Sequence, residues 1–317
     1  MQLGFVSAIL PDQSLDQVFA IAAARGYACV EVMCWPHGRA ERRYAGITHI
    51  DCDSLDDVAV AHVHELSDRH GVAISGLGYY PNPLSPDAEE SRTCIAHLRK
   101  VMHAAVRLGV TQVNTFIGRD WRASVEDNWP RFREVWRPLV AEAASLGLHI
   151  GIENCPMLFT KDEWPGGKNL AASPDIWRRM FSDIPDPCFG LNYDPSHLVW
   201  QHIDHLKPLR EFAPRIHHVH AKDVQMNHTQ LAEVGILATP LNYHQPVLPG
   251  RGTIDWPRFF KELSAIGYVG PVCVEVEDRA FEGELVSRVE ALRQTQVFLA
   301  PLLAAQLPRP LAKKVSG

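Results

Sequence analysis

The sequence predicts a single (β/α)8 barrel, and three observations support this fold. Short apolar runs alternate with longer helical patterns along all 317 residues, as expected for parallel strands linked by helices. No change in composition marks a second domain, and the length is usual for such a barrel. An open doubly wound sheet, the runner-up, should carry Gly-x-Gly-x-x-Gly after its first strand, and none is there. We therefore expect one barrel over residues 1–307 and a flexible tail over 308–317.

Eight apolar runs are the expected strands, and each is followed by a helical pattern. The strands cover 2–6, 28–33, 72–78, 111–116, 148–153, 188–193, 215–220 and 271–276. The helices cover 14–25, 54–70, 87–108, 131–146, 174–182, 205–212, 256–266 and 282–303. Asp53 and Ser54 are the expected N-cap of the second helix, and glycine just past the helix in "RLGV", "SLGLHI" and "AIGYVG" is the expected C-terminal stop. Three long connections, 34–53, 154–173 and 221–255, follow strands and so lie on the C-terminal face, where barrel enzymes build their sites.

Composition and charge exclude several classes of function. The chain is 46% hydrophobic and 21% charged, with a net charge of −6, which is ordinary for a globular enzyme and lacks the basic footprint of a nucleic-acid binder. No signal-peptide pattern is visible, and no apolar run approaches the roughly 18–20 residues that span a membrane. The seven cysteines are odd in number and form no Cys-x-x-Cys, which argues against a disulfide framework and a thiolate zinc site. We expect a cytoplasmic protein without nucleic-acid or membrane partners.

Polar residues end four consecutive predicted strands, the fifth to the eighth. Because strand side chains alternate between faces, one set points to the helices and the other into the barrel. The inward set brings a metal-competent residue to the C-terminal end of each strand, namely Glu153, Asp194, His220 and Glu275. Converging carboxylates repel one another unless a cation binds them. Two glutamates, an aspartate and a histidine suit one divalent ion of intermediate hardness, with Mn²⁺ favoured over Co²⁺, Mg²⁺, Fe²⁺ and Zn²⁺.

Simpler interpretations stay open for several of these positions. In the simpler interpretation, Asp194 is an N-cap for a helix after Pro195 and not a metal ligand. His218 is then a polar interior residue beside the metal. Glu277 has the same strand parity as Glu275, so the pattern alone does not separate them. Glu31, also at a strand end, is interpreted as structural or as a substrate contact, with the structural role favoured.

Five motifs in order along the chain resemble the xylose isomerase-like TIM-barrel superfamily, in particular its sugar phosphate isomerase/epimerase branch. They are "IGIENCP", "NYDPSH", "HVHAKD", "PGRGTIDW" and "VCVEVED". The resemblance implies that Glu153, Asp194, His220 and Glu275 are the metal ligands, which selects Glu275 over Glu277. It also implies that His197, in the Asp-Pro-Ser-His motif, contacts the substrate.

Two positions depart from the pattern of the ketose 3-epimerases in this superfamily. Where those enzymes have an arginine six residues after the ligand histidine, this chain has Met226. Where they have a glutamate six residues after the glutamate of the fifth strand, it has Phe159. The resemblance therefore implies a substrate shell different from that of a typical ketose 3-epimerase.

The implied reaction is proton transfer next to a carbonyl, through an enediolate that the metal stabilises. Glu153 and Glu275 would remove and return the proton, and His197 would orient or polarise a substrate oxygen. Further substrate contacts are expected from the long loops, namely Lys168, Lys222, Arg251 and Trp35. For Lys168, in the glycine-containing segment 162–169 interpreted as a lid, a solvated surface role is an equal alternative. Lys222 can instead pair with Asp223, and Trp35 can simply be packed.

The first functional hypothesis is a metal-dependent isomerase or epimerase of a sugar, keto-sugar or cyclitol, with a small carbohydrate as its partner. The second is a lyase, dehydratase or decarboxylase that uses the same metal on a keto-sugar. An abasic-site endonuclease is disfavoured by the acidic charge and by the lack of an evident cluster for further zinc ions. A non-catalytic binding module is disfavoured by the four intact candidate ligands. Such barrels often associate, so a homo-oligomer is also expected.

Overall fold

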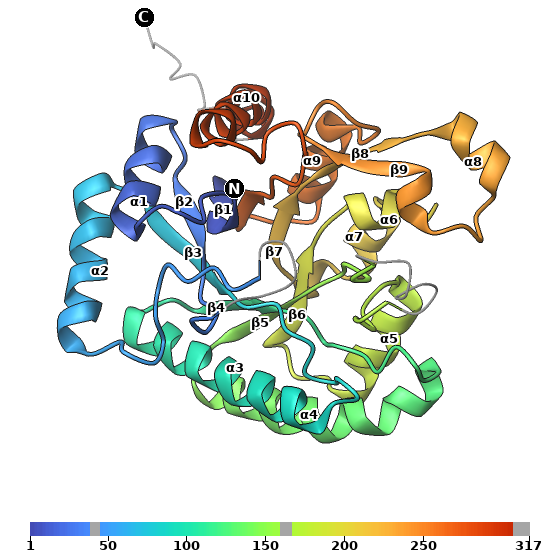
Figure 1. The fold of residues 1–317 in the computed structure, drawn as a ribbon, viewed down its shortest axis with the longest axis horizontal. Helices are drawn as coiled ribbons and strands as arrows, with labels where there is room; N and C mark the ends of the chain where they lie inside the picture. Colours follow the sequence, from blue (N-terminus) through green and yellow to red (C-terminus); the bar gives the residue numbers. More distant parts are fainter. Residues whose placement is uncertain (39–44, 159–166, 307–317) are drawn as a thin grey trace, which may run out of the picture.

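The expected parallel barrel is present in the computed structural model, which describes residues 1–38, 45–158 and 167–306 (Figure 1). Eight parallel strands close in the order β1-β10-β7-β6-β5-β4-β3-β2. Their bounds are β1 (Gln2–Val6), β2 (Cys29–Met33), β3 (Ala73–Gly78), β4 (Gln112–Thr115), β5 (His149–Glu153), β6 (Phe189–Tyr193), β7 (Ile216–Ala221) and β10 (Pro271–Val274). Each corresponds to one of the predicted apolar runs, so the fold prediction is confirmed.

Helices surround the strands, and most agree with the predicted patterns. They are α1 (Leu15–Ala24), α2 (Asp57–His70), α3 (Ala88–Leu108), α4 (Val125–Ser145), α5 (Pro174–Asp183), α6 (Ser196–Val199), α7 (Lys207–Glu211), α9 (Trp256–Ala265) and α10 (Leu285–Ala304). Gly109, just past α3, has a φ of 66°, which glycine adopts without the strain of a Cβ, so the predicted glycine stop is confirmed there.

The predicted starts of α2 and α4 were wrong, in each case because a different side chain caps the helix. The N-cap of α2 is Asp56, which accepts a hydrogen bond from Ala59 N at 2.8 Å. Asp53 and Ser54 lie in the preceding turn, where both donate to the carboxylate of Asp51. Helix α4 begins at Val125 rather than 131, because Ser124 Oγ accepts from Asp127 N and starts the helix earlier.

The connection predicted as a loop over 221–255 contains a small antiparallel sheet. Strands β8 (Asp223–Met226) and β9 (His244–Val247) pair with each other, and α8 (His228–Val234) lies between them in sequence. Figure 1 shows this excursion projecting beside the barrel. The sequences of the two strands, DVQM and HQPV, are half polar and include a proline, so they lack the apolar run that predicts a strand.

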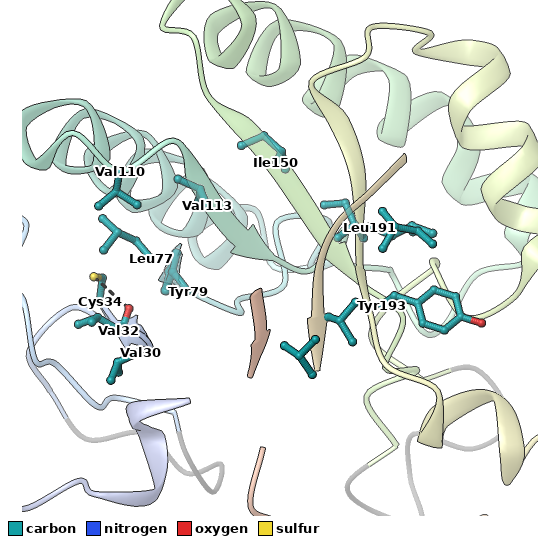
Figure 2. Close-up of a cluster of buried hydrophobic side chains, with 14 of the residues drawn as sticks. Val30, Val32, Cys34, Leu77, Tyr79, Val110, Val113, Ile150, Leu191 and Tyr193 are labelled. Carbon is teal, nitrogen blue, oxygen red and sulfur yellow. Dashed lines mark hydrogen bonds between the residues drawn. The ribbon is translucent and has the colours of Figure 1, made fainter. Parts of the chain in front are cut away.

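The apolar residues of the strands separate into two groups, as the strand alternation predicts. The outer group packs between strands and helices, and Figure 2 shows Val30 of β2, Leu77 of β3, Val113 of β4 and Ile150 of β5 within it. A smaller group fills the interior of the barrel and includes Cys29, Met33, Tyr80, Phe116 and Cys273. The inward face of each strand is therefore the face that carries the polar residues considered next.

Three further expectations concern the cysteines, membrane-spanning helices and two segments of the chain. All seven cysteines are free, in agreement with the expected absence of disulfides. Within the described ranges, every helix is too short or too polar to cross a membrane. The expected tail over 308–317 and most of the segment 162–169 lie outside the described residues.

Candidate metal centre

Four side chains meet at the C-terminal end of the barrel, and they are the four that the sequence singled out. Glu153 ends β5, Asp194 follows β6, His220 lies on β7, and Glu275 follows β10 directly. One oxygen or nitrogen of each lies within 4.8 Å of those of the others. These strands are neighbours in the order β5-β6-β7-β10, so their ends converge without any long loop.

One buried polar atom in this cluster, Nδ1 of His220, has no hydrogen-bond partner among the described residues. The His220 nitrogen lies 3.7 Å from Glu153 Oε1 and 3.7 Å from Glu275 Oε2. An unpaired buried polar atom is costly, and an imidazole nitrogen among carboxylate oxygens is a donor set for a divalent cation. The residues present therefore fit a metal ion.

The two carboxylate oxygens of Asp194 have different neighbours. Its Oδ1 accepts a hydrogen bond from Ser196 N at 2.8 Å, at the start of the short helix α6. Its Oδ2 faces the cluster, 3.3 Å from Nε2 of His197. The contact with Ser196 N holds the carboxylate so that its other oxygen is directed at the cluster, and the N-cap of α6 is Pro195.

Lys222 lies inside the cluster rather than at its rim. Its buried Nζ is 2.6 Å from Glu275 Oε2, 3.0 Å from Asp194 Oδ2 and 3.1 Å from Glu277 Oε2. Burial alone would lower the pKa of this ammonium group, but Asp194 and Glu275 raise it well above its usual value. Lys222 therefore stays charged and offsets part of the repulsion between the carboxylates.

His197 is the second buried group beside the carboxylates, and both of its ring nitrogens have close neighbours. Trp200 Nε1 lies 3.3 Å from His197 Nδ1. Nε2 lies 2.9 Å from Lys222 Nζ and 3.4 Å from Glu153 Oε1. His197 and Lys222 thus bring two nitrogen atoms to the same space beside the carboxylates.

The two glutamates of the cluster have different environments. Burial and the neighbouring Glu153 raise the pKa of Glu275 to about 7, against the opposing effect of Lys222. Burial would also raise the pKa of Glu153, but His197 and His220 outweigh it and hold that pKa well below its usual value. Carboxylates whose pKa values are pushed apart are suited to different acid and base roles.

A polar network lies directly beneath the cluster, inside the barrel. Glu31 of β2 is completely buried, and its Oε2 lies 2.7 Å from His220 Nε2. Tyr80 donates a hydrogen bond to the other oxygen of Glu31. His218 lies beside them, with Nδ1 2.9 Å from Asn192 Oδ1. The sequence shows Glu31 near a strand end, but its partner His220 comes from a strand that is not a neighbour in the sheet.

The neighbours of the other three predicted substrate contacts are known in part among the described residues. Arg251 is exposed and donates to Gln294 of α10, with its guanidinium over the ring of Phe281. Lys168 Nζ lies 4.8 Å from the centre of the Trp121 ring. Trp35 packs edge-on against Tyr79, with ring centres 4.9 Å apart. Lys222 and His197 contact the cluster, and a substrate contact by the other three stays a prediction.

Met226, where the sequence departs from the epimerase pattern, lies in an apolar environment. Met226 is buried in an apolar group with Trp200, Val224 and Tyr243, on the side of the cluster that carries His197. The other departure, Phe159, lies outside the described residues.

Comparison with known proteins gives a consistent result for the fold. A family model described as a xylose isomerase-like TIM barrel matches residues 19–301. YfiH of Bacillus subtilis (strain 168), an uncharacterized protein, is 30% identical over 319 residues, covering 93% of this chain and 99% of that protein. Inosose dehydratase of Geobacillus thermodenitrificans (strain NG80-2) is 33% identical over 122 residues, which cover 35% of this chain and 38% of that enzyme. A solved D-psicose 3-epimerase is similar in fold, with a TM-score of 0.68 at 14% identity, covering 96% of this chain and 99% of that one.

Proposed function

The chain belongs to the xylose isomerase-like TIM-barrel family, and we propose that it is a divalent-metal-dependent isomerase or epimerase of a sugar, keto-sugar or cyclitol. The observation that carries this proposal is the convergence of three carboxylates and an imidazole, whose buried Nδ1 lacks a hydrogen-bond partner among the described residues. Such a constellation suits chemistry at a carbon next to a carbonyl, where a proton must be removed and returned.

In this proposal Glu153, Asp194, His220 and Glu275 hold one divalent ion, with Mn²⁺ the preferred species for this mixed donor set. The ion, when bound, supplies Lewis acidity to a substrate carbonyl and its neighbouring hydroxyl. The remaining work belongs to the side chains, which bind and orient the substrate and exchange its proton. A small carbohydrate is the proposed partner, and a cytoplasmic location is proposed with it.

Glu153 and Glu275 are the proposed acid and base. They come from β5 and β10, which are separated around the barrel by β6 and β7, so they approach a bound substrate from different sides. One carboxylate removes the proton and the other returns it, which inverts or relocates a stereocentre. His197 and Lys222 donate hydrogen bonds to substrate oxygens and so fix its orientation.

A dehydratase is the second candidate, and the contact between Lys222 and His197 favours it. A buried ammonium group 2.9 Å from an imidazole can protonate a hydroxyl that leaves from the carbon beyond the one deprotonated. The apolar group around Met226, in place of an epimerase arginine, is compatible with this outcome. The partial similarity to inosose dehydratase agrees with it.

Metal content is the first test of the proposal. We expect about one divalent ion per chain in the wild type and its loss from a Glu153→Ala, Asp194→Ala double variant. Glu277→Gln is the matched control, because this carboxylate has the same strand parity and contacts Lys222 but lies outside the group of four. Failure to bind any ion after incubation with Mn²⁺ would contradict the mechanism, and about three zinc ions per chain would support the nuclease alternative.

The reaction is then identified by NMR in D₂O with keto-sugars and keto-cyclitols. An isomerase or epimerase incorporates solvent deuterium at the carbon next to the carbonyl and forms a product of the same composition. A dehydratase forms a product that has lost water. Metal binding without either reaction across these substrates would contradict both candidates.

A further inference from the structure

We infer that Glu31 is a positioning residue for the metal centre, which holds His220 through Nε2–H so that Nδ1 is presented to the ion. The inference rests on the metal-ligand set proposed above and extends it by a residue from the opposite side of the barrel. Strand β2 is separated from β7 by β1 and β10 in the closed sheet, so Glu31 reaches His220 across the interior.

The contact is short, buried and fixed at both oxygens of the carboxylate. Oε2 of Glu31 lies 2.7 Å from His220 Nε2, and Oε1 accepts a hydrogen bond from the Tyr80 hydroxyl. Gly78 provides the space, since a Cβ there would lie 2.7 Å from Glu31 Oε1. Both Glu31 and His220 are completely buried, so water does not compete for the contact.

The neighbours of Nε2 determine which ring nitrogen carries the proton. A carboxylate only accepts hydrogen bonds, so Nε2 at 2.7 Å from Glu31 must be protonated, because a bare nitrogen there would be repelled. The amide Nδ2 of Asn192 is also 2.9 Å from Nε2, but it is a donor and cannot receive this proton. Nδ1 of the neutral ring is then unprotonated, and it is the atom that faces Glu153 and Glu275. Histidine ligands are held in this way by a carboxylate on their second nitrogen.

Glu31 is directed at His220 and not at the other buried histidine. Nδ1 of His218 is 3.7 Å from Glu31 and instead makes its contact with Asn192 Oδ1. Its Nε2 faces Ser75 Oγ at 3.3 Å. Both nitrogens of His218 are therefore engaged, so a second ion shared by Glu31, His218 and His220 would have to break existing contacts.

The test measures metal affinity, which does not depend on knowing the substrate. Titration of metal-free protein with Mn²⁺, followed by the EPR signal of the free ion, gives Kd for the wild type, Glu31→Gln and Tyr80→Phe. We expect Glu31→Gln to weaken binding by about 10–100-fold, and Tyr80→Phe to weaken it by about 10-fold. Ser75→Ala is the matched control, because it removes a hydroxyl from the same network that contacts His218 and not His220. Tyr80→Phe keeps the test decisive where Glu31→Gln fails to fold.

A double-mutant cycle separates positioning from a general effect of charge or folding. In a His220→Ala background, Glu31→Gln should cause little further loss of Mn²⁺ affinity, since Glu31 acts through the imidazole. Equal losses in both backgrounds, or wild-type affinity in Glu31→Gln and Tyr80→Phe, would overturn the inference while leaving the proposed function intact. A wild type that binds no Mn²⁺ would instead overturn the proposed function itself.

Discussion

At the scale of single residues, the unusual feature is the buried ammonium group of Lys222 among acidic side chains. Its Nζ lies within 3.1 Å of oxygens from Asp194, Glu275 and Glu277, and 2.9 Å from His197. If Lys222 only balanced the charge of the carboxylates, a bound cation could take over that role. From its contact with His197 we propose a second role, as a proton donor or a substrate anchor.

Lys222→Met separates these two roles. Methionine keeps the length and packing of the side chain but removes the charge. We expect activity to fall by about 10²-fold or more, because a positioned proton donor is lost. Mn²⁺ should bind at least as tightly as in the wild type, because a positive charge beside the ion is removed. Turnover by NMR and Kd by titration are the measurements, with the exposed Lys207→Met as control. A parallel loss of metal and activity would mean that Lys222 only maintains the cluster.

At the scale of elements, strand alternation explains how much of the site could be predicted. The inward parity of Glu153, Asp194, His220 and Glu275 is a local property of each strand, and the sequence contains it. The positions of Arg251 and Lys168 depend instead on which neighbour a loop side chain meets. Arg251 meets Gln294 of α10, a contact that no local pattern specifies. The caps of α2 and α4 were missed for a similar reason, because several nearby polar residues can cap a helix equally well.

At the N-terminal end of the barrel, opposite the cluster, we expect the contacts of His217 on β7 to depend on pH. His217, near the start of β7, stacks on His149 of β5 with ring centres 4.7 Å apart, and its Nε2 lies 3.1 Å from Pro187 O. Burial, together with His149, lowers the pKa of His217 to about 4. The unfolded chain therefore binds more protons than the folded protein below about pH 6.5, the usual pKa of histidine.

The sign of this difference gives a prediction for His217→Gln. The contribution of a neutral His217 to stability is complete above about pH 6.5 and is lost as the pH falls toward 4. Relative to the variant, the wild type should therefore lose about 2 kcal/mol of unfolding free energy over this range, a figure reduced for the partial exposure of the ring. Urea unfolding of both proteins at several pH values, with chelator present, measures the change. A difference between them that stays constant with pH would contradict the assignment.

At the scale of the whole molecule, closure of the barrel creates contacts between residues of strands that are not neighbours. The contact between Glu31 and His220 joins residues 189 positions apart in sequence, on strands that are not neighbours in the sheet. The sequence shows Glu31 near the end of a strand but does not show which residue it contacts, and for this reason the structural interpretation is the one that it favours. The interior of a closed barrel brings distant inward residues together, and this is the part of the site that the sequence could not specify.

The same closure links metal binding to the stability of the whole fold. The proposed ligands come from four strands, so an ion that binds them binds the folded chain and not the unfolded one. At a free Mn²⁺ concentration of 100 times Kd, this linkage adds about 2.7 kcal/mol to the unfolding free energy. For a domain of this size, the melting temperature should then rise by roughly 5 °C over protein in chelator. Scanning calorimetry at one heating rate measures the shift, and the Glu153→Ala, Asp194→Ala variant should not show it. An equal shift in that variant would mean that Mn²⁺ stabilises the protein at another site.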